Sequence, residues 1–400
     1  MKESFEVAVV GAGPAGSIAA LTLARAGVSV ALLEKQQFPR DKVCGDVLMP
    51  DAIGLLRELR LWEDVRTRGH SMGFARIFAP DATHVDLAGK FHTIQRTDLD
   101  LLLAKKATEA GASLISGAEA TDFKATTSAA PNAATLGYVK NGERKELQVR
   151  LALLACGAHA KTLGRFGVSL RETPSAIAMR TYYRLRDDLD DTRLFFWFER
   201  AVLPGYGWIF PLGNGVFNIG VGIFRDAGQA GQNLRHVLNS FLTQCEAPRE
   251  MIRGGTQLAP FKGAPLRTGL TGAKPSGDRL LVCGESIGST YSMSGEGIGK
   301  AMETANVAAE HALDALSSGN LTARDLARYD DNLELRFRER FTSYRTGQYW
   351  LGRPAVCNFV FGSARTSPRM RSILEGIIAE SRNPTDLLSP WGLLQAFVLR

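Results

Sequence analysis

Residues 5–34 have the sequence FEVAVVGAGPAGSIAALTLARAGVSVALLE, and this stretch decides the fold. The apolar run Phe5–Val10 predicts a buried strand, and the apolar spacing over residues 17–26 predicts a helix. Gly27 marks the end of that helix, and Val28–Leu33 is expected to form a second strand. The pattern therefore predicts a β–α–β unit with two parallel strands.

The loop between the first strand and the helix has the spacing G-x-G-x-x-G. Gly11 and Gly13 would let the backbone turn and approach a pyrophosphate, and Gly16 would let helix and strand pack closely. The amides at the helix start would face phosphates, and Glu34 is placed to accept hydrogen bonds from a ribose. The motif predicts an adenine dinucleotide, either FAD or a nicotinamide cofactor. Glycines that serve packing alone are the alternative.

Composition excludes several classes of protein. The 400 residues, 45% of them hydrophobic, suffice for one large core or for two domains. The strand near Met1 has no basic leader ahead of it, and no apolar run approaches the ~20 residues of a membrane span, so we expect a cytoplasmic protein. Five scattered cysteines favour a reducing compartment. Without a CxxC pair or a histidine cluster, we expect no metal site.

The formal net charge is +7 and the isoelectric point is near 9.2. Three partners fit this charge: an anionic substrate or cofactor, an anionic membrane surface, or nucleic acid. The basic residues are dispersed and form no known nucleic-acid module, so we expect no nucleic-acid partner. An ordinary charged surface is the remaining interpretation.

Buried strands are expected in three separated parts of the chain, namely Phe5–Leu33, Leu151–Ala155 and Leu280–Cys283. Much alternating, strand-like sequence lies between them, including a hairpin signal at Asn141-Gly142. This order favours an α/β (α+β) fold in which a nucleotide-binding domain is interleaved with an antiparallel substrate sheet. Smaller expectations are a helix capped by Thr97 or Asp98, and a helical segment after residue 318 with breaks at Pro354, Pro368, Pro384 and Pro390.

Four stretches together resemble FAD-dependent oxidoreductases related to p-hydroxybenzoate hydroxylase and, within them, the geranylgeranyl reductase family. The first is the glycine motif, and the second is Arg96 with Asp100 at the head of a helix. The third is GDRLLVCGE at 277–285, followed by SGEGIG at 294–299. The fourth is FPRDKVCG at 38–45 with GYGWIFPLG at 205–213 and NIGVG at 218–222, similar to the PxxKxCG and GYxWxFPxG…NxGxG patterns of prenyl-chain reductases.

The resemblance implies a Rossmann-type FAD-binding domain interleaved with an antiparallel-sheet substrate domain, followed by C-terminal helices. The expected FAD-binding domain comprises residues 1–72, 93–172 and 273–318. The expected substrate domain comprises 73–92 and 173–272, and 319–400 is the helical segment.

The resemblance also implies that FAD is the cofactor, with Glu285 on the ribityl hydroxyls and backbone amides of 295–299 near the reduced flavin. The full set of expected cofactor-binding residues is Gly11, Gly13, Ala15, Gly16, Glu34, Lys35, Cys44, Gly45, Arg96, Gly284, Glu285, Gly295, Gly297, Ile298 and Gly299.

Three residues are candidates for a catalytic role. Trp208 and Phe210 would line an apolar channel over the flavin, or they are ordinary core aromatics. Cys44 would shape the pocket or help to protonate a carbon, or it is a small buried hydrophobe.

The expected activity is reduction of isolated C=C bonds in a prenyl or polyprenyl-quinone substrate, by hydride transfer from reduced flavin N5. The expected partners are an apolar or lipid substrate and a separate electron donor, NAD(P)H or a reductase or ferredoxin. The alternatives are a flavin-dependent monooxygenase, a halogenase acting on a secondary metabolite or a carrier- or protein-bound residue, and a non-enzymatic FAD-binding module. The chain lacks a full WxWxIP tract expected of a halogenase.

The sequence departs from the family pattern at three places. Cys156-Gly157 and Gly284-Glu285 stand where the family usually has aspartate, and Tyr291–Met293 stands where it usually has a proline. The first departure leaves direct use of a nicotinamide open. Finally, the apolar segment Trp391–Arg400 is expected to cover the channel, to lie on a membrane surface, or simply to pack as a helix on the main body.

Overall fold

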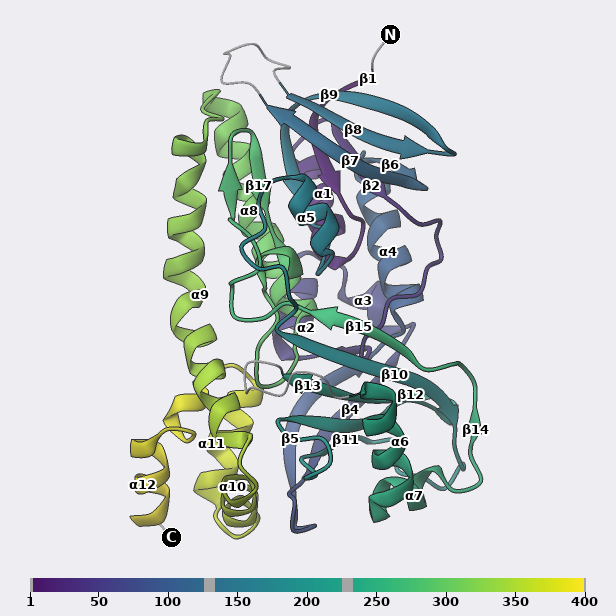
Figure 1. The fold of residues 1–400 in the computed structure, drawn as a ribbon, viewed down its shortest axis with the longest axis vertical. Helices are drawn as coiled ribbons and strands as arrows, with labels where there is room; N and C mark the ends of the chain where they lie inside the picture. The colour runs from purple at the N-terminus through teal and green to yellow at the C-terminus, as the bar shows by residue number, and fades with distance from the viewer. Residues whose placement is uncertain (1–2, 126–133, 225–232, 399–400) are drawn as a thin grey trace.

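The computed structural model describes residues 3–125, 134–224 and 233–398. Two sheets lie at opposite ends of the molecule, and helix α9 (Ala323–Leu351) runs along one side (Figure 1). The expected α/β fold with two interleaved sheets and C-terminal helices is confirmed.

The first sheet is built around strand β1 (Glu3–Val10), which pairs in parallel with β2 (Val30–Glu34) and β9 (Glu143–Leu154). β17 (Leu280–Val282) pairs in parallel with the other edge of β9, so the three separated apolar stretches become neighbours as expected. The remaining strands are β6 (Ser113–Ser116), β7 (Ala118–Ala125), β8 (Ala134–Lys140) and β16 (Ser276–Gly277). The hairpin between β8 and β9 turns at Asn141 and Gly142, both with positive φ (52° and 80°), as its sequence predicts.

Helix α1 (Pro14–Arg25) follows β1 and packs against α4 (Arg96–Glu109) and α8 (Ile298–Ser318). It begins three residues earlier than expected, because Pro14 occupies a position where its ring favours a helix start. The expected cap of α4 is wrong: the helix begins at Arg96 after Gln95, so Asp98 lies within the first turn. There the carboxylate faces the positive end of the helix rather than capping it. Short helices α2 (Pro50–Glu58), α3 (Trp62–Arg66), α5 (Ala160–Arg165) and the 3-10 helix η2 (Gly284–Ile287) complete this part.

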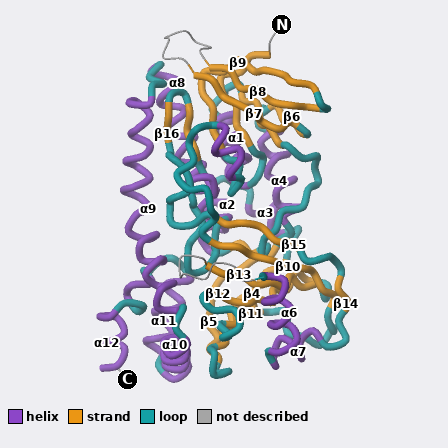
Figure 2. Tube along the Cα trace, in the orientation of Figure 1, coloured by secondary structure: helices purple, strands orange, loops and turns teal. Residues whose placement is uncertain are grey.

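The second sheet has the order β14-β10-β13-β12-β11-β4-β5-β3, with β15 also paired to β10. Its pairs are antiparallel except for β11 with β4. The strands are β3 (Val47–Leu48), β4 (His70–Phe78), β5 (His84–Thr93), β10 (Ala176–Arg184), β11 (Arg193–Trp197), β12 (Gly205–Gly213), β13 (Val216–Phe224), β14 (Thr256–Gln257) and β15 (Lys262–Leu266). Helices α6 (Leu234–Gln244) and α7 (Glu246–Ile252) cover one face (Figure 2). β3 and the start of β4 lie within residues 1–72, which are expected to belong to the FAD-binding domain.

The C-terminal helices contact both sheets. α9 contacts α8 and β16, whereas α10 (Pro354–Thr366) and α11 (Pro368–Ile378) contact β5. η3 (Pro384–Asp386) and α12 (Pro390–Val398) follow. Each of the four expected proline breaks is the first residue of one of these helices, where the missing N–H costs nothing. Within the described ranges, every helix is too short or too polar to cross a bilayer.

Candidate active site

A cavity of about 480 Å³ is lined by residues of both sheets. Its wall combines the glycine loop after β1, the loop before β3, strands β12 and β13, and the loop before α8. Most of the expected site residues line it: Gly11, Gly13, Ala15, Glu34, Lys35, Cys44, Gly45, Arg96, Trp208, Phe210, Glu285, Gly295, Gly297 and Ile298.

Three of the expected cofactor residues lie outside this lining. A Cβ on Gly16 would lie 1.7 Å from the Gly11 carbonyl oxygen, and a Cβ on Gly299 would lie 1.9 Å from an Asp51 carboxylate oxygen. Gly284 has φ +67°, and a Cβ there would lie 2.7 Å from that of Ala15. These glycines allow close packing behind the cavity, a role that the sequence predicts for Gly16 alone.

Two arginines converge on a buried carboxylate beside the glycine loop. The Arg96 Nε and Nη2 atoms donate to Asp100 at 2.7 and 2.9 Å, and Arg40 Nη1 lies 2.9 Å from the same carboxylate. Both guanidinium groups lie within 4 Å of the point where a Cβ on Gly13 would stand. Burial alone would lower the pKa of Arg96, but Asp100 outweighs it and raises that pKa, so the guanidinium stays charged. The two guanidinium groups thus lie beside the glycine loop, where the motif predicts a pyrophosphate.

Glu34 is held in place at the end of β2. Its carboxylate accepts hydrogen bonds from the backbone N–H of Ala12 and of Gln36, each at 3.1 Å, and Arg40 Nη2 lies 3.2 Å away. The acid thus lies in the cavity lining, and its contact with a ribose stays a prediction.

Glu285 has one carboxylate oxygen that is not used by the protein. Its Oε1 atom is buried and has no hydrogen-bond partner. A buried unpaired carboxylate oxygen is costly, so a bound group with hydroxyl donors would relieve it. The residues here fit the ribityl arm of FAD.

Four aromatic side chains form one wall of the cavity, which we call the aromatic wall: Phe196, Tyr206, Trp208 and Phe210. The centroids of their neighbouring rings lie 4.9 to 6.0 Å apart. Trp208 and Phe210 are 5% and 4% exposed and belong to a buried hydrophobic cluster. These two residues therefore line the cavity and also pack in the core. A Cβ on Gly45 would lie 3.2 Å from the Phe210 ring, so the loop of Cys44 packs against this wall.

The Cys44 side chain lines the cavity next to the aromatic wall. Burial raises the pKa of its thiol, and the positive charge of Arg96 opposes the shift only in part. The sulfur therefore stays protonated at neutral pH.

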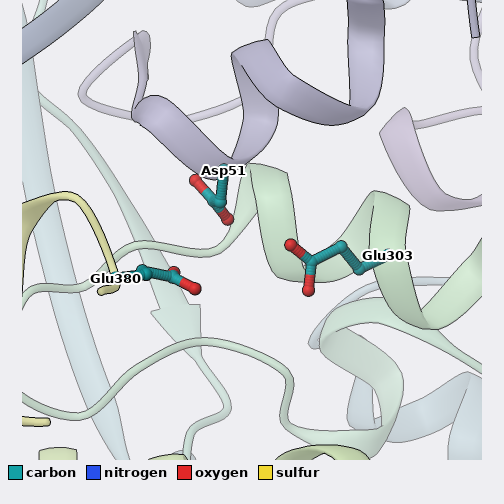
Figure 3. A group of neighbouring side chains, drawn as sticks. All are labelled: Asp51, Glu303 and Glu380. Carbon is teal, nitrogen blue, oxygen red and sulfur yellow. The ribbon is translucent and has the colours of Figure 1, made fainter. Parts of the chain in front are cut away.

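Three carboxylates meet beside the start of α8. Figure 3 shows Asp51, Glu303 and Glu380 pointing toward one another from α2, α8 and the turn after α11. The Lys300 ammonium reaches all three, at 3.3, 2.7 and 2.8 Å, and so supplies the positive charge that a metal ion would otherwise bring. Burial raises the pKa of Glu303 to about 7.

The chain is similar to known proteins over most of its length. Residues 4–192 match an FAD binding domain, and residues 175–256 match the geranylgeranyl reductase catalytic domain. Menaquinone reductase of Mycobacterium tuberculosis is 33% identical over 337 residues, which cover 82% of this chain and 78% of that protein. The chain belongs to the geranylgeranyl reductase family.

Two further proteins are similar to this chain, one in sequence and one in fold. Digeranylgeranylglycerophospholipid reductase of Methanosarcina acetivorans is 30% identical, over 85% of this chain and 82% of that protein. The crystal structure of a geranylgeranyl bacteriochlorophyll reductase-like protein from Thermoplasma acidophilum superposes with a TM-score of 0.81 at 20% identity, covering 100% of this chain and 96% of that one. The protein is an FAD-dependent oxidoreductase, as expected, and FAD is its cofactor.

Sequence reasoning missed four residues that the structure brings to the site or next to it: Arg40, Phe196, Tyr206 and Asn218. Arg40, Tyr206 and Asn218 lie inside the family motifs quoted above, which offered a signal. Phe196 lies in an ordinary strand, and nothing in its local sequence marks it.

Proposed function

We propose that this protein reduces isolated C=C bonds in the prenyl chain of a lipid or quinone. The observation that carries the proposal is the aromatic wall, which gives a mainly apolar cavity next to the FAD-binding loops. The names of the reductase relatives support the same substrate class. FAD, when bound, supplies the hydride.

The chain's own residues would bind the cofactor, orient the substrate and exclude water from the cavity. The glycine loop with Arg40 and Arg96 would hold the diphosphate, and Glu285 would accept hydrogen bonds from the ribityl hydroxyls. The first backbone amides of α8 would stabilise the negative charge of the reduced cofactor. The aromatic wall would hold the prenyl chain in a dry slot. Cys44, as a thiol, is the candidate donor of the proton that completes the reduction. We further propose that the two sheets correspond to separate cofactor and substrate domains.

The test is product analysis. The holoprotein, reduced chemically under anaerobic conditions, is incubated with a geranylgeranyl lipid and with a polyprenyl quinone. The proposal expects a product that gains two hydrogens per double bond. A product that gains oxygen or a halogen, formed only with air, would instead establish the monooxygenase or halogenase alternative.

Replacing Glu285 by alanine is expected to weaken FAD binding about tenfold to a hundredfold, because a hydrogen bond to a charged group contributes roughly 1.5–3 kcal/mol. The dissociation constant is measured by quenching of FAD fluorescence. Glu285→Asp keeps the carboxylate and matches the usual family residue, so it should restore most of the affinity. Equal binding by the alanine variant would show that Glu285 does not contact the cofactor.

For the electron donor, we propose a separate molecule: NAD(P)H, or a reductase or ferredoxin. Cys156-Gly157 lines the cavity where the family usually has aspartate, so the two cases need a direct comparison. Bleaching of the flavin absorbance by NADPH or NADH under nitrogen would identify a nicotinamide donor. Bleaching by reduced ferredoxin alone would identify the protein donor.

We propose that α12 contacts an anionic membrane surface. Trp391 and Leu394 are 67% and 55% exposed, and Trp391 shares a surface hollow with Arg369 and Arg382. Exposed apolar side chains beside basic ones are typical of interfacial helices. The last two residues of the expected segment, 399–400, lie outside the described part of the chain.

The double variant Trp391→Ser/Leu394→Ser is expected to lose most of its co-sedimentation with vesicles rich in phosphatidylglycerol, because both side chains would insert into the interface. Leu335→Ser is the matched control, since Leu335 is 87% exposed on α9. If both variants sediment like the wild type, α12 does not bind the membrane.

A further inference from the structure

A chain of buried hydrogen bonds lies behind the aromatic wall, and Asn218 is its centre. The Trp208 indole Nε1 donates to Asn218 Oδ1 at 2.9 Å. Asn218 Nδ2 in turn donates to the Cys44 carbonyl oxygen at 2.7 Å and to Asp46 Oδ2 at 2.8 Å. The Asn218 side chain is fully buried, and its amide uses both hydrogens and its oxygen.

Asp46 is the second buried member of this network. Its Oδ2 also accepts a hydrogen bond from the Tyr182 hydroxyl at 2.7 Å, whereas its Oδ1 is buried without a partner. Its backbone has φ 65°, a conformation that aspartate and asparagine tolerate better than most residues. The Arg180 guanidinium stacks over the Tyr182 ring, 4.2 Å from its centroid, and pairs with Asp41.

An apolar core would fill this space at lower cost, because a buried carboxylate oxygen without a donor is unfavourable. What the network does achieve is geometric. Cys44 and Trp208 are 164 positions apart in sequence, and a single amide joins the backbone of one to the side chain of the other. The Asn218 amide is fully used, and a buried polar group held by several hydrogen bonds fixes one arrangement of the residues around it.

We propose that Asn218 and Asp46 are positioning residues that hold Cys44 and Trp208 at a fixed separation on the cavity wall. The functional consequence rests on the proposed reduction, in which a prenyl bond lies between the thiol and the aromatic wall. Displacing one of these two groups by about 1 Å is enough to slow such a reaction strongly.

Asp46 makes the network sensitive to pH. Burial raises the pKa of Asp46 to about 6, although the hydrogen bonds from Tyr182 and Asn218 and the charges of Arg180 and Arg96 oppose the shift. The carboxyl is therefore protonated below about pH 6 and ionised above it. Burial raises the pKa of the Cys44 thiol, so this group does not titrate in this range.

The direct test follows the Trp208 indole N–H of the FAD-bound protein by nuclear magnetic resonance, with tryptophan labelled by nitrogen-15. The Trp208→Phe variant assigns the resonance. In the wild type its chemical shift should titrate with a midpoint near pH 6, and in Asp46→Asn it should be flat from pH 5 to 8. This readout does not depend on the substrate, so it stands or falls separately from the proposed function. A wild-type resonance that ignores pH, or one that titrates equally in Asp46→Asn, overturns the proposal.

A kinetic test adds the consequence for catalysis. Asn218→Leu should lower kcat about tenfold to a hundredfold and leave the dissociation constant of FAD within about twofold, because the amide lies behind the aromatic wall and does not itself line the cavity. Asn218→Ser introduces one hydroxyl that can make part of these hydrogen bonds, so its kcat should fall between those of the wild type and Asn218→Leu. It replaces the leucine variant if that protein does not fold. Ser343→Ala is the control: it breaks a part-buried hydrogen bond to Thr385 at 2.9 Å, neither residue lines the cavity, and the substitution should lower Tm with kcat unchanged. Unchanged kcat in a folded Asn218 variant contradicts the positioning role.

Discussion

Gly16→Ala protein is expected to lose bound FAD and to unfold more easily, by on the order of 3 kcal/mol. The new methyl group would stand 1.7 Å from the Gly11 carbonyl oxygen, where neither backbone can move without opening the loop that follows β1. Gly11 itself has φ +100°, and a Cβ there would lie 2.5 Å from the Ala155 carbonyl oxygen, so the turn has little room to move away from the new methyl group. Flavin absorbance per protein and the thermal unfolding midpoint measure the two effects.

Gly54→Ala is the matched control for that substitution. Gly54 lies within α2, and a Cβ there meets nothing within 4 Å. The variant should keep its FAD and gain about 1 kcal/mol of stability, because alanine favours a helix over glycine. If Gly16→Ala behaves like Gly54→Ala, the close packing of α1 on β1 is not what the fold requires.

The second large effect is expected at Asp100. Asp100→Ala removes the buried carboxylate that Arg40 and Arg96 share, and leaves two buried guanidinium groups with less compensation. Breaking a buried ion pair in this way costs roughly 3–5 kcal/mol. Denaturant unfolding of the FAD-free protein measures the loss directly.

Asp98→Ala provides the comparison for Asp100→Ala, since Asp98 is exposed in the first turn of the same helix. Its loss should cost about 0.3–1 kcal/mol through the helix dipole alone. Added FAD should recover more stability in Asp100→Ala than in Asp98→Ala, because the cofactor diphosphate would supply the missing negative charge. Equal small losses of unfolding free energy in both variants would mean that other groups compensate the charges of Arg40 and Arg96.

Much of the cofactor half follows from the sequence because its signals are local. The apolar run before Gly11 and the glycine spacing after it define strand, turn and helix within thirty residues. The buried run Leu151–Ala155 is equally plain, and its parallel pairing beside β1 follows from its burial on both faces. The proline breaks after residue 318 are local signals of the same kind.

The rest depends on contacts between distant parts of the chain. Gly299 looks like a cofactor glycine in its motif, but the packing of Asp51 against it appears only when α2 meets α8. Asn218 lies 174 positions from Cys44, and no local pattern pairs them. Arg40 sits in a loop of mixed charge, where its partner Asp100 comes from a separate helix.

The most direct test of the central claim is a single turnover without oxygen. The purified protein with its FAD reduced is mixed rapidly with a prenyl lipid or polyprenyl quinone, and flavin reoxidation is followed by absorbance and the product by mass spectrometry. The account predicts reoxidation at a rate that depends on the prenyl substrate, with two hydrogens gained at a double bond of the prenyl chain. Flavin that stays reduced with every prenyl substrate and is reoxidised only by oxygen would contradict it.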